Sequence, residues 1–162
     1  MKAFALLLLL IAPLTSPAPR DDPFFSRLLG TWIGKGTAFG SPARVQARWE
    51  SVLEDKYTRL NLNYVYRDSN GAENSFSEHG YYQNKGNGLY EGYWFDTQNN
   101  QYPIKATLDG DSLTALWGIP DKIEGRSIYR IVDGGKSLEV VDALKQKDGT
   151  WKEFSHFKLK PG

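Results

Sequence analysis

Apolar and polar residues alternate with a period of two along most of this chain. The clearest case is residues 58–66, where Leu60, Leu62, Tyr64 and Tyr66 fall on one face and mainly polar residues on the other. This period is typical of a half-buried antiparallel β-strand. The same pattern predicts ten strands, at 31–39, 44–54, 57–67, 73–83, 88–97, 101–108, 112–118, 124–132, 137–146 and 150–160.

Short segments rich in Gly, Asn and Asp separate these strands, for example residues 68–71 and 109–111. Such segments suit tight hairpin loops, and they leave no room for crossover helices. Closure of the sheet would remove its two edges. We therefore predict an all-β fold, a ten-stranded antiparallel up-and-down β-barrel, over residues 31–162.

The residues before the first strand favour a short N-terminal helix. Asp22 can serve as its N-cap and Pro23 suits the first helical position. Four apolar residues then share one face, namely Phe24, Phe25, Leu28 and Leu29. We predict a helical lid over residues 19–30 that caps one end of the barrel.

The first 18 residues predict a secretory signal peptide rather than part of the fold. Lys2 precedes an apolar run at residues 4–12, Pro13 ends that run, and Ser16-x-Ala18 offers a cleavage site. The run is too short for an ordinary transmembrane helix. The sequence thus predicts export, with no membrane insertion once the signal is removed.

Charge and cysteine content narrow the partners and the compartment. Without Lys2 the chain has 19 basic and 19 acidic residues, so a neutral domain gives no reason to expect nucleic acid as a partner. There is no cysteine and no Asn-x-Ser/Thr sequon, which favours a bacterial periplasmic or secreted protein over a eukaryotic extracellular one.

Three glycines surround a tryptophan in the first strand, in the order Gly30-x-Trp32-x-Gly34-x-Gly36. Trp32 could line a ligand pocket or close one end of the barrel. Glycines beside a large ring are a packing device, so we interpret all four residues as a structural plug.

This motif is similar to the start of the calycin barrels, which include the lipocalins, the fatty-acid-binding proteins and the nitrobindin-like haem-binding barrels. A wider resemblance over residues 28–160 is to uncharacterised bacterial exported lipocalin-like proteins. It rests on residues 48–53, 89–96, 117–118, 125–130 and 148–154. The resemblance implies a barrel and transfers no activity.

Haem is the one cofactor that the resemblance suggests. Nitrobindin-like barrels hold haem through a histidine near the C-terminus, and this chain has only His79 and His156. The motif around His156 does not match. Structural histidines are the simpler interpretation, and we expect no metal site and no cofactor, with haem binding as the alternative function.

The richest candidate binding residues are aromatic. Tyrosines and a tryptophan on the middle strands could line an amphipathic lumen, and two arginines could clamp an anion. Alternatively, the rings fill the barrel and the arginines lie on its outside. The candidate ligand-binding residues are Tyr64, Tyr66, Tyr81, Tyr93, Trp94, Arg126 and Arg130.

No nucleophile, phosphate-loop or metalloprotease motif is present, and we assign no catalytic residue. The leading hypothesis is an exported binding protein for a small hydrophobic or amphipathic molecule. A barrel enzyme, either an isomerase or a hydrolase, is a further alternative because strands can assemble an acid–base pair that no local motif reveals. An envelope interaction module would be favoured by a filled lumen.

Overall fold

The computed structural model describes residues 18–19, 21–119 and 122–162, so the signal peptide predicted at 1–18 lies, apart from Ala18, outside the described residues. These segments form a short helix, a 3-10 turn and ten strands. The elements are α1 (Phe25–Leu28), β1 (Gly30–Ala38), β2 (Ser41–Val52), β3 (Tyr57–Arg67), β4 (Glu73–Gly86), β5 (Leu89–Asp96), β6 (Gln101–Asp109), β7 (Ser112–Ile119), β8 (Lys122–Val132), η1 (Asp133–Gly135), β9 (Ser137–Lys145) and β10 (Trp151–Pro161).

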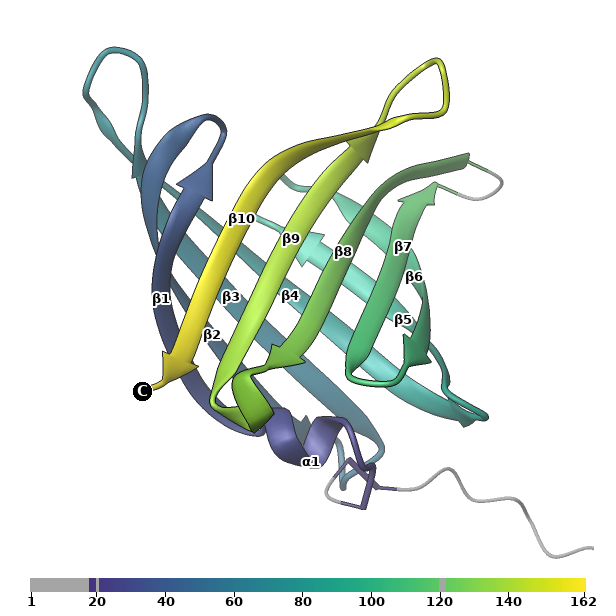
Figure 1. Ribbon diagram of the computed structural model, residues 1–162. Coiled ribbons are helices and arrows are strands. Elements are labelled where there is room, and N and C mark those ends of the chain that lie inside the picture. Colours follow the sequence, from purple (N-terminus) through teal and green to yellow (C-terminus); the bar gives the residue numbers. More distant parts are fainter. Residues whose placement is uncertain (1–17, 20, 120–121) are drawn as a thin grey trace, which may run out of the picture.

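The strands form a closed antiparallel barrel, as the alternating pattern predicts. Each strand pairs with its neighbours in sequence, and β1 also pairs with β10, which closes the sheet (Figure 1). Every predicted strand overlaps an observed one, and the ends differ by no more than three residues. The all-β, ten-stranded barrel is therefore confirmed.

The helix is shorter than predicted. We expected it over residues 19–30, but α1 spans only Phe25–Leu28. Leu29 has an extended backbone, with φ −53° and ψ 132°, and Gly30 with φ +117° opens β1. The apolar spacing continued through Leu29, whereas the chain must turn there to enter the first strand.

Segment 22–28 lies across one end of the barrel, which we call the closed end (Figure 1). The Asp22 carboxylate accepts hydrogen bonds from the N–H groups of Phe24 and Phe25, both at 2.9 Å. It thereby satisfies two donors at the helix start. The ring of Phe25 packs against Trp49 and Tyr90, at centroid distances of 5.6 and 5.1 Å.

Two glycines of β1 let the first and last strands come together. A Cβ on Gly34 would lie 2.2 Å from the carbonyl oxygen of Lys158, and one on Gly36 would lie 1.9 Å from that of His156. Only glycine permits this approach. Trp32 is buried beside them, and its Nε1–H donates to the carbonyl oxygen of Leu28 at 2.8 Å.

Large side chains fill the barrel from the closed end to its middle. Trp49 contacts Tyr129 edge to face at 5.2 Å, and the hydroxyls of Tyr82 and Tyr129 lie 3.3 Å apart. Leu60, Leu62 and other aliphatic residues complete this packed interior. Much of the lumen is therefore core, and space for a ligand must be sought at the other end.

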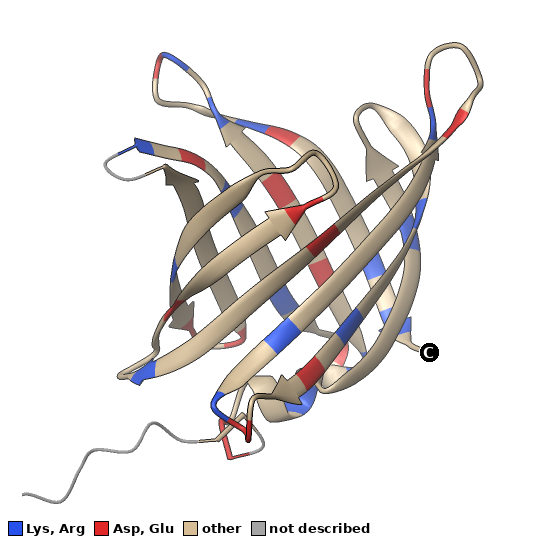
Figure 2. Ribbon diagram, turned by 180° about the vertical axis from the view of Figure 1, so that it is seen from behind, with Lys and Arg blue, Asp and Glu red and all other residues tan. Residues whose placement is uncertain are grey.

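Lysine, arginine and acidic residues are spread over the strands and loops, with a group of basic residues near the C-terminus (Figure 2). In the strand register, Lys35 on β1 lies directly opposite Arg44 on β2 and Lys158 on β10. In the described part of the chain, no helix is long and apolar enough to span a membrane.

Candidate functional site

A cavity of about 210 Å³ lies at the end opposite α1, which we call the open end. The loops there join β1 to β2, β5 to β6 and β9 to β10, whereas segment 22–28 contacts residues near the β4–β5 and β6–β7 loops. The apolar and aromatic lining residues are Phe39, Phe76, Trp94, Trp117, Leu144 and Phe154. The polar lining residues are Glu78, Asp96, Gln98, Asn100, Tyr102 and Glu124.

Stacked rings form one side of this cavity. Trp94 and Trp117 lie with centroids 5.9 Å apart and planes 22° apart, and Tyr102 continues the stack at 5.6 Å from Trp117. Phe39 and Phe154 stack across the mouth at 5.4 Å. Flat, rigid rings of this kind offer a large contact area to a planar ligand.

Glu78 is the most unusual residue of the site. Its side chain points inward from β4, is only 2% exposed and lines the cavity. Within the described residues, no hydrogen-bond donor reaches its Oε1. Burial, with the nearby charges of Asp142 and Asp96, raises the pKa of Glu78 well above its ordinary value of 4.5. A buried acid without partners costs stability, so it suggests a functional role.

Asp142 adds a second buried carboxyl on β9. It lies between Ser127 on β8 and Ser155 on β10, whose hydroxyl donates to its Oδ2. The indole N–H of Trp117 donates to Ser127 at 3.2 Å. Burial raises the pKa of Asp142, while the two serine hydroxyls oppose that shift. A row of polar contacts therefore links the stacked indoles to a second acid.

Tyr64 completes the polar set. It is buried, and among the described residues its hydroxyl has no hydrogen-bond partner. Burial raises its pKa strongly, and the charges of Glu78 and Asp142 add to that effect. Three buried oxygens that receive no hydrogen bond from the described residues, Glu78 Oε1, Asp142 Oδ1 and Tyr64 Oη, thus lie on β4, β9 and β3.

The other two acids of the lining have partners. Asp96 accepts hydrogen bonds from the N–H of Gln98, the N–H of Asn100 and the side-chain amide of Asn100, at 2.9, 3.0 and 2.9 Å. Glu124 lies 3.2 Å from Lys122 Nζ. Asp96 therefore holds the β5–β6 turn, and Glu124 belongs to the rim.

The structure separates the seven predicted ligand-binding residues. Trp94 lines the cavity, Tyr64 lies in the core beneath it, and half-buried Tyr66 contacts Phe39 at 5.1 Å. Tyr81 and Tyr93 pair directly on the outside of β4 and β5, where Tyr93 is 52% exposed. Neither of these two lines the lumen.

The two arginines also lie outside the barrel. Arg126 stacks over the ring of Trp151 at 4.6 Å, and Arg130 pairs with Glu139 at 2.8 Å. Both arginines therefore have the outward position that we gave as the alternative to an anion-binding role. Neither arginine is among the residues that line the cavity.

Both histidines lie on the outer face. His156 Nε2 is 3.0 Å from Glu139, and its Nδ1 is 3.4 Å from Glu153. His79 follows inward-facing Glu78 on β4, so its side chain points outward. A haem held in the lumen by either histidine does not fit this arrangement, and the cavity is smaller than the roughly 300 Å³ at which pockets for drug-sized ligands begin. Over the described ranges, no three His, Cys, Asp or Glu side chains are grouped to hold a metal ion.

Sequence reasoning missed Glu78, Asp142, Trp117 and Tyr102. A signal for Glu78 was present, because it shares a strand face with Phe76, Gly80 and Tyr82. Placing Tyr82 inside the barrel would have placed Glu78 inside as well. An acidic residue is so rarely buried that its polarity argued for the opposite face.

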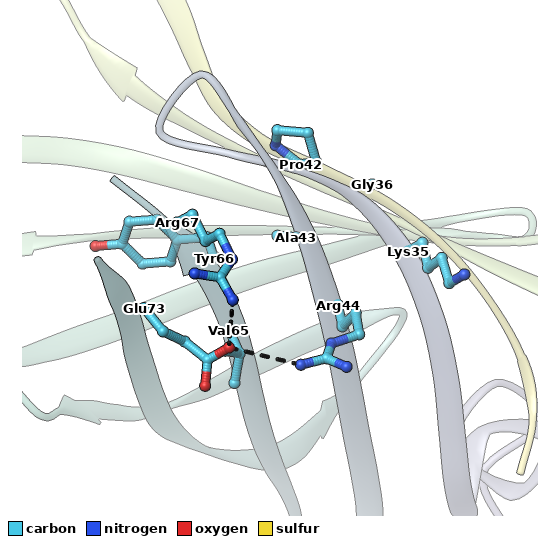
Figure 3. Close-up of a pocket in the computed structure, with 9 residues that line it drawn as sticks. All are labelled: Lys35, Gly36, Pro42, Ala43, Arg44, Val65, Tyr66, Arg67 and Glu73. Carbon is cyan, nitrogen blue, oxygen red and sulfur yellow. Dashed lines mark ion pairs between the residues drawn. The ribbon is translucent and has the colours of Figure 1, made fainter. Parts of the chain in front are cut away.

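A second hollow, of about 480 Å³, lies on the outside of β1, β2 and β3 (Figure 3). Glu73 lies 3.8 Å from Arg44 and 3.9 Å from Arg67 there. All three side chains are more than half exposed, so water and salt weaken these ion pairs. We therefore place the candidate site in the cavity at the open end.

Comparison with known proteins adds support for the fold. No family model and no curated protein matches the chain. The crystal structure of Rv2717c from M. tuberculosis superposes with a TM-score of 0.60 at 16% identity, over 85% of this chain and 94% of that one. A fluorescence-activating β-barrel designed de novo matches with a TM-score of 0.40 at 11% identity, over 85% of this chain and 95% of that one. At such identities the likeness to Rv2717c concerns the barrel alone.

Proposed function

We propose that this chain is an exported, lipocalin-like binding protein that holds a small amphipathic molecule at the open end of its barrel. The ligand would lie against the indoles of Trp94 and Trp117, with a polar group directed at Glu78. The observation that carries the proposal is the buried Oε1 of Glu78, which no donor of the described residues reaches, in the lining of an aromatic cavity.

The packing of the barrel supports this location. Sites for small molecules are concave, mostly apolar and provided with a few polar groups that fix orientation. The open end combines these properties, whereas the closed end is filled by Phe25, Trp49 and Tyr82. We therefore assign ligand binding to the open end of the lumen and stabilisation of the fold to the packed closed end.

The test uses indole as a neutral aromatic probe. Titration followed by NMR should shift the indole N–H signals of Trp94 and Trp117 before those of the other three tryptophans. Trp94→Ala should weaken binding about tenfold through the lost stacking. Tyr93→Ala is the matched control, since it removes a ring from the outer face of the same strand and should leave the affinity unchanged. Equal weakening in both variants would contradict the proposal.

A barrel enzyme is the second candidate, and one observation favours it. Glu78 and Asp142 are buried acids whose pKa values lie above the ordinary range, beside the hydroxyl of Tyr64. Such groups can donate or accept a proton near neutral pH. The test is exchange of carbon-bound hydrogen for deuterium in small ketones incubated with the protein in heavy water. Exchange that Glu78→Gln abolishes would support an enzyme, and its absence would remove this candidate.

A further inference from the structure

The charged side chains that line the cavity are all acidic. They are Glu78, Asp96 and Glu124, and no Lys, Arg or His of the described chain is among the lining residues. Lys122, Lys145 and Lys147 line an adjoining hollow, which shares Glu124 and Leu144 with the cavity. Within the described residues, the charged side chains that face a ligand inside the cavity are therefore acidic.

Among the described residues, two of the three acids have hydrogen-bond or ion-pair partners, and Glu78 has an oxygen without one. The carboxylate of Asp96 is occupied by the donors of its turn, and Glu124 has Lys122 beside it. Glu78 is 2% exposed, and its Oε1 receives no hydrogen bond from the described residues. Asp142 Oδ1, deeper in the lumen, is unpartnered as well. These buried oxygens need donors, and a bound molecule can supply them.

We propose that the ligand is a small organic cation, with N–H donors attached to a flat apolar body, such as a protonated amine or an amidinium. This inference rests on the proposed binding function and names its ligand class. The N–H groups would donate to Glu78, in a pairing that is strong because both partners are charged. The apolar body would lie on the stack of Trp94, Trp117 and Tyr102, whose ring faces also attract cations.

The size of the cavity limits the cation. At about 210 Å³ it is smaller than sites for drug-sized ligands, which begin at roughly 300 Å³. A single six-membered ring with a short nitrogen-bearing group suits that space. Longer polyamines and macrocycles would have to extend past Phe39 and Phe154 into solvent.

Binding of such a cation is coupled to loss of a proton. Burial, then Asp142, then Asp96 raise the pKa of free Glu78, so this carboxyl keeps its proton to a higher pH than an exposed glutamate does. A bound cation favours the ionised form and releases that proton. Affinity for the cation therefore rises as pH increases through the pKa of the free acid. The ionisable groups around Glu78 that act on the same lumen are Asp96, Glu124, Asp142, Tyr64, Tyr82, Tyr102 and Tyr129.

The experiment compares three probes of nearly equal shape, benzamidine, benzamide and benzoate, by isothermal titration calorimetry. Benzamidine is a cation with N–H donors, benzamide its neutral counterpart and benzoate an anion. We expect the wild-type protein to bind benzamidine about thirtyfold or more tightly than benzamide. The heat of binding should vary with the ionisation enthalpy of the buffer, since a proton is released.

Glu78→Gln tests the assignment to a single carboxyl. It keeps the shape of the side chain and removes its charge, so the preference for benzamidine over benzamide should fall to about threefold or less. Asp142→Asn provides a second reading, with a smaller loss of preference, because Asp142 lies deeper in the lumen. Retention of the full preference in both variants would overturn the proposal.

The outcomes also separate this inference from the proposed function. Suppose that benzamide or benzoate binds as tightly as benzamidine while indole still shifts the Trp94 and Trp117 signals. The proposed cationic ligand class is then wrong, and the proposed binding site is retained. If benzamidine binds and its preference survives in Glu78→Gln but is lost when Glu124 is replaced by Gln, the rim and not the cavity recognises it. If indole and all three probes leave both tryptophans unchanged, the binding function itself fails.

Discussion

The two ends of the barrel treat a buried carboxyl in opposite ways. At the closed end, Asp22 is 1% exposed and accepts four hydrogen bonds, from Phe24 N–H, Phe25 N–H, Asn84 Nδ2 at 2.6 Å and Tyr90 Oη at 2.9 Å. At the open end, Glu78 is equally buried, but its Oε1 receives none from the described residues. Burial alone therefore does not distinguish the two acids, whereas the presence or absence of hydrogen-bond donors among the described residues does.

The same contrast holds for the aromatic rings. Phe25 is enclosed by Trp49, Tyr82 and Tyr90, so the rings of the closed end complete one another. Trp94 and Trp117 stack on each other and leave space beside them. The closed end is packed as protein core, and the open end contains a cavity lined by aromatic rings.

The largest expected effect comes from removing the ring at the centre of the closed end. Phe25→Ala should lower the free energy of unfolding by about 3–5 kcal/mol, because it deletes a fully buried ring among four others. Phe154→Ala, at the half-buried mouth, should cost only about 1 kcal/mol. Urea denaturation of both variants measures the difference. Equal losses would show that the open end is packed as firmly as the closed one.

Asp22→Ala should follow, with a loss of about 3 kcal/mol, because it leaves two backbone N–H groups and two side-chain donors without an acceptor. Asp22→Asn retains one carbonyl oxygen and should lose less. Thermal unfolding of both variants, with Asn84→Ala as the single-donor control, gives the order. A loss below that of Asn84→Ala would mean that the four hydrogen bonds of Asp22 do not stabilise the closed end of the barrel.

Glu78→Gln should have the smallest effect and the opposite sign, a gain of about 1 kcal/mol near neutral pH. Since the pKa of Glu78 is raised in the folded state, the native protein binds more protons than the unfolded chain above pH 4.5. Its stability then falls as pH rises from that value through the folded pKa. Glu78→Gln should flatten this part of the profile, and Asp142, whose pKa is also raised, contributes to the slope that remains. An unchanged profile would contradict the assignment.

The fold could be predicted from the sequence because its signals are local. Residues 58–66 alternate almost strictly, and β3 begins and ends within one residue of this pattern. The helix was predicted too long because helical spacing and the start of a strand overlap at Leu29, and only the backbone at Gly30 separates them.

The site was harder to predict because both faces of the middle strands are aromatic. Tyr81 and Tyr82 are adjacent, as are Tyr93 and Trp94, so hydropathy cannot decide which member of each pair points inward. In the structure, Gly80 and Gly92 share the inward face with Tyr82 and Trp94. Glu78 lies on that same face, against the usual preference of an acid for solvent.

The pairing of β1 with β10 has a consequence for how the barrel assembles. Nine of the ten strand pairs join neighbours in sequence, and each can form as a hairpin as soon as its two strands exist. The remaining pair must bring together the two extremes of the domain, at the highest loop-closure entropy. We therefore expect β1 and β10 to pair last, after the hairpins have formed. Gly34 and Gly36 permit this pairing because they let the two strands approach closely. We also expect the barrel to open first along this junction, so the amide hydrogens of β1 and β10 should exchange with solvent before those of the hairpins.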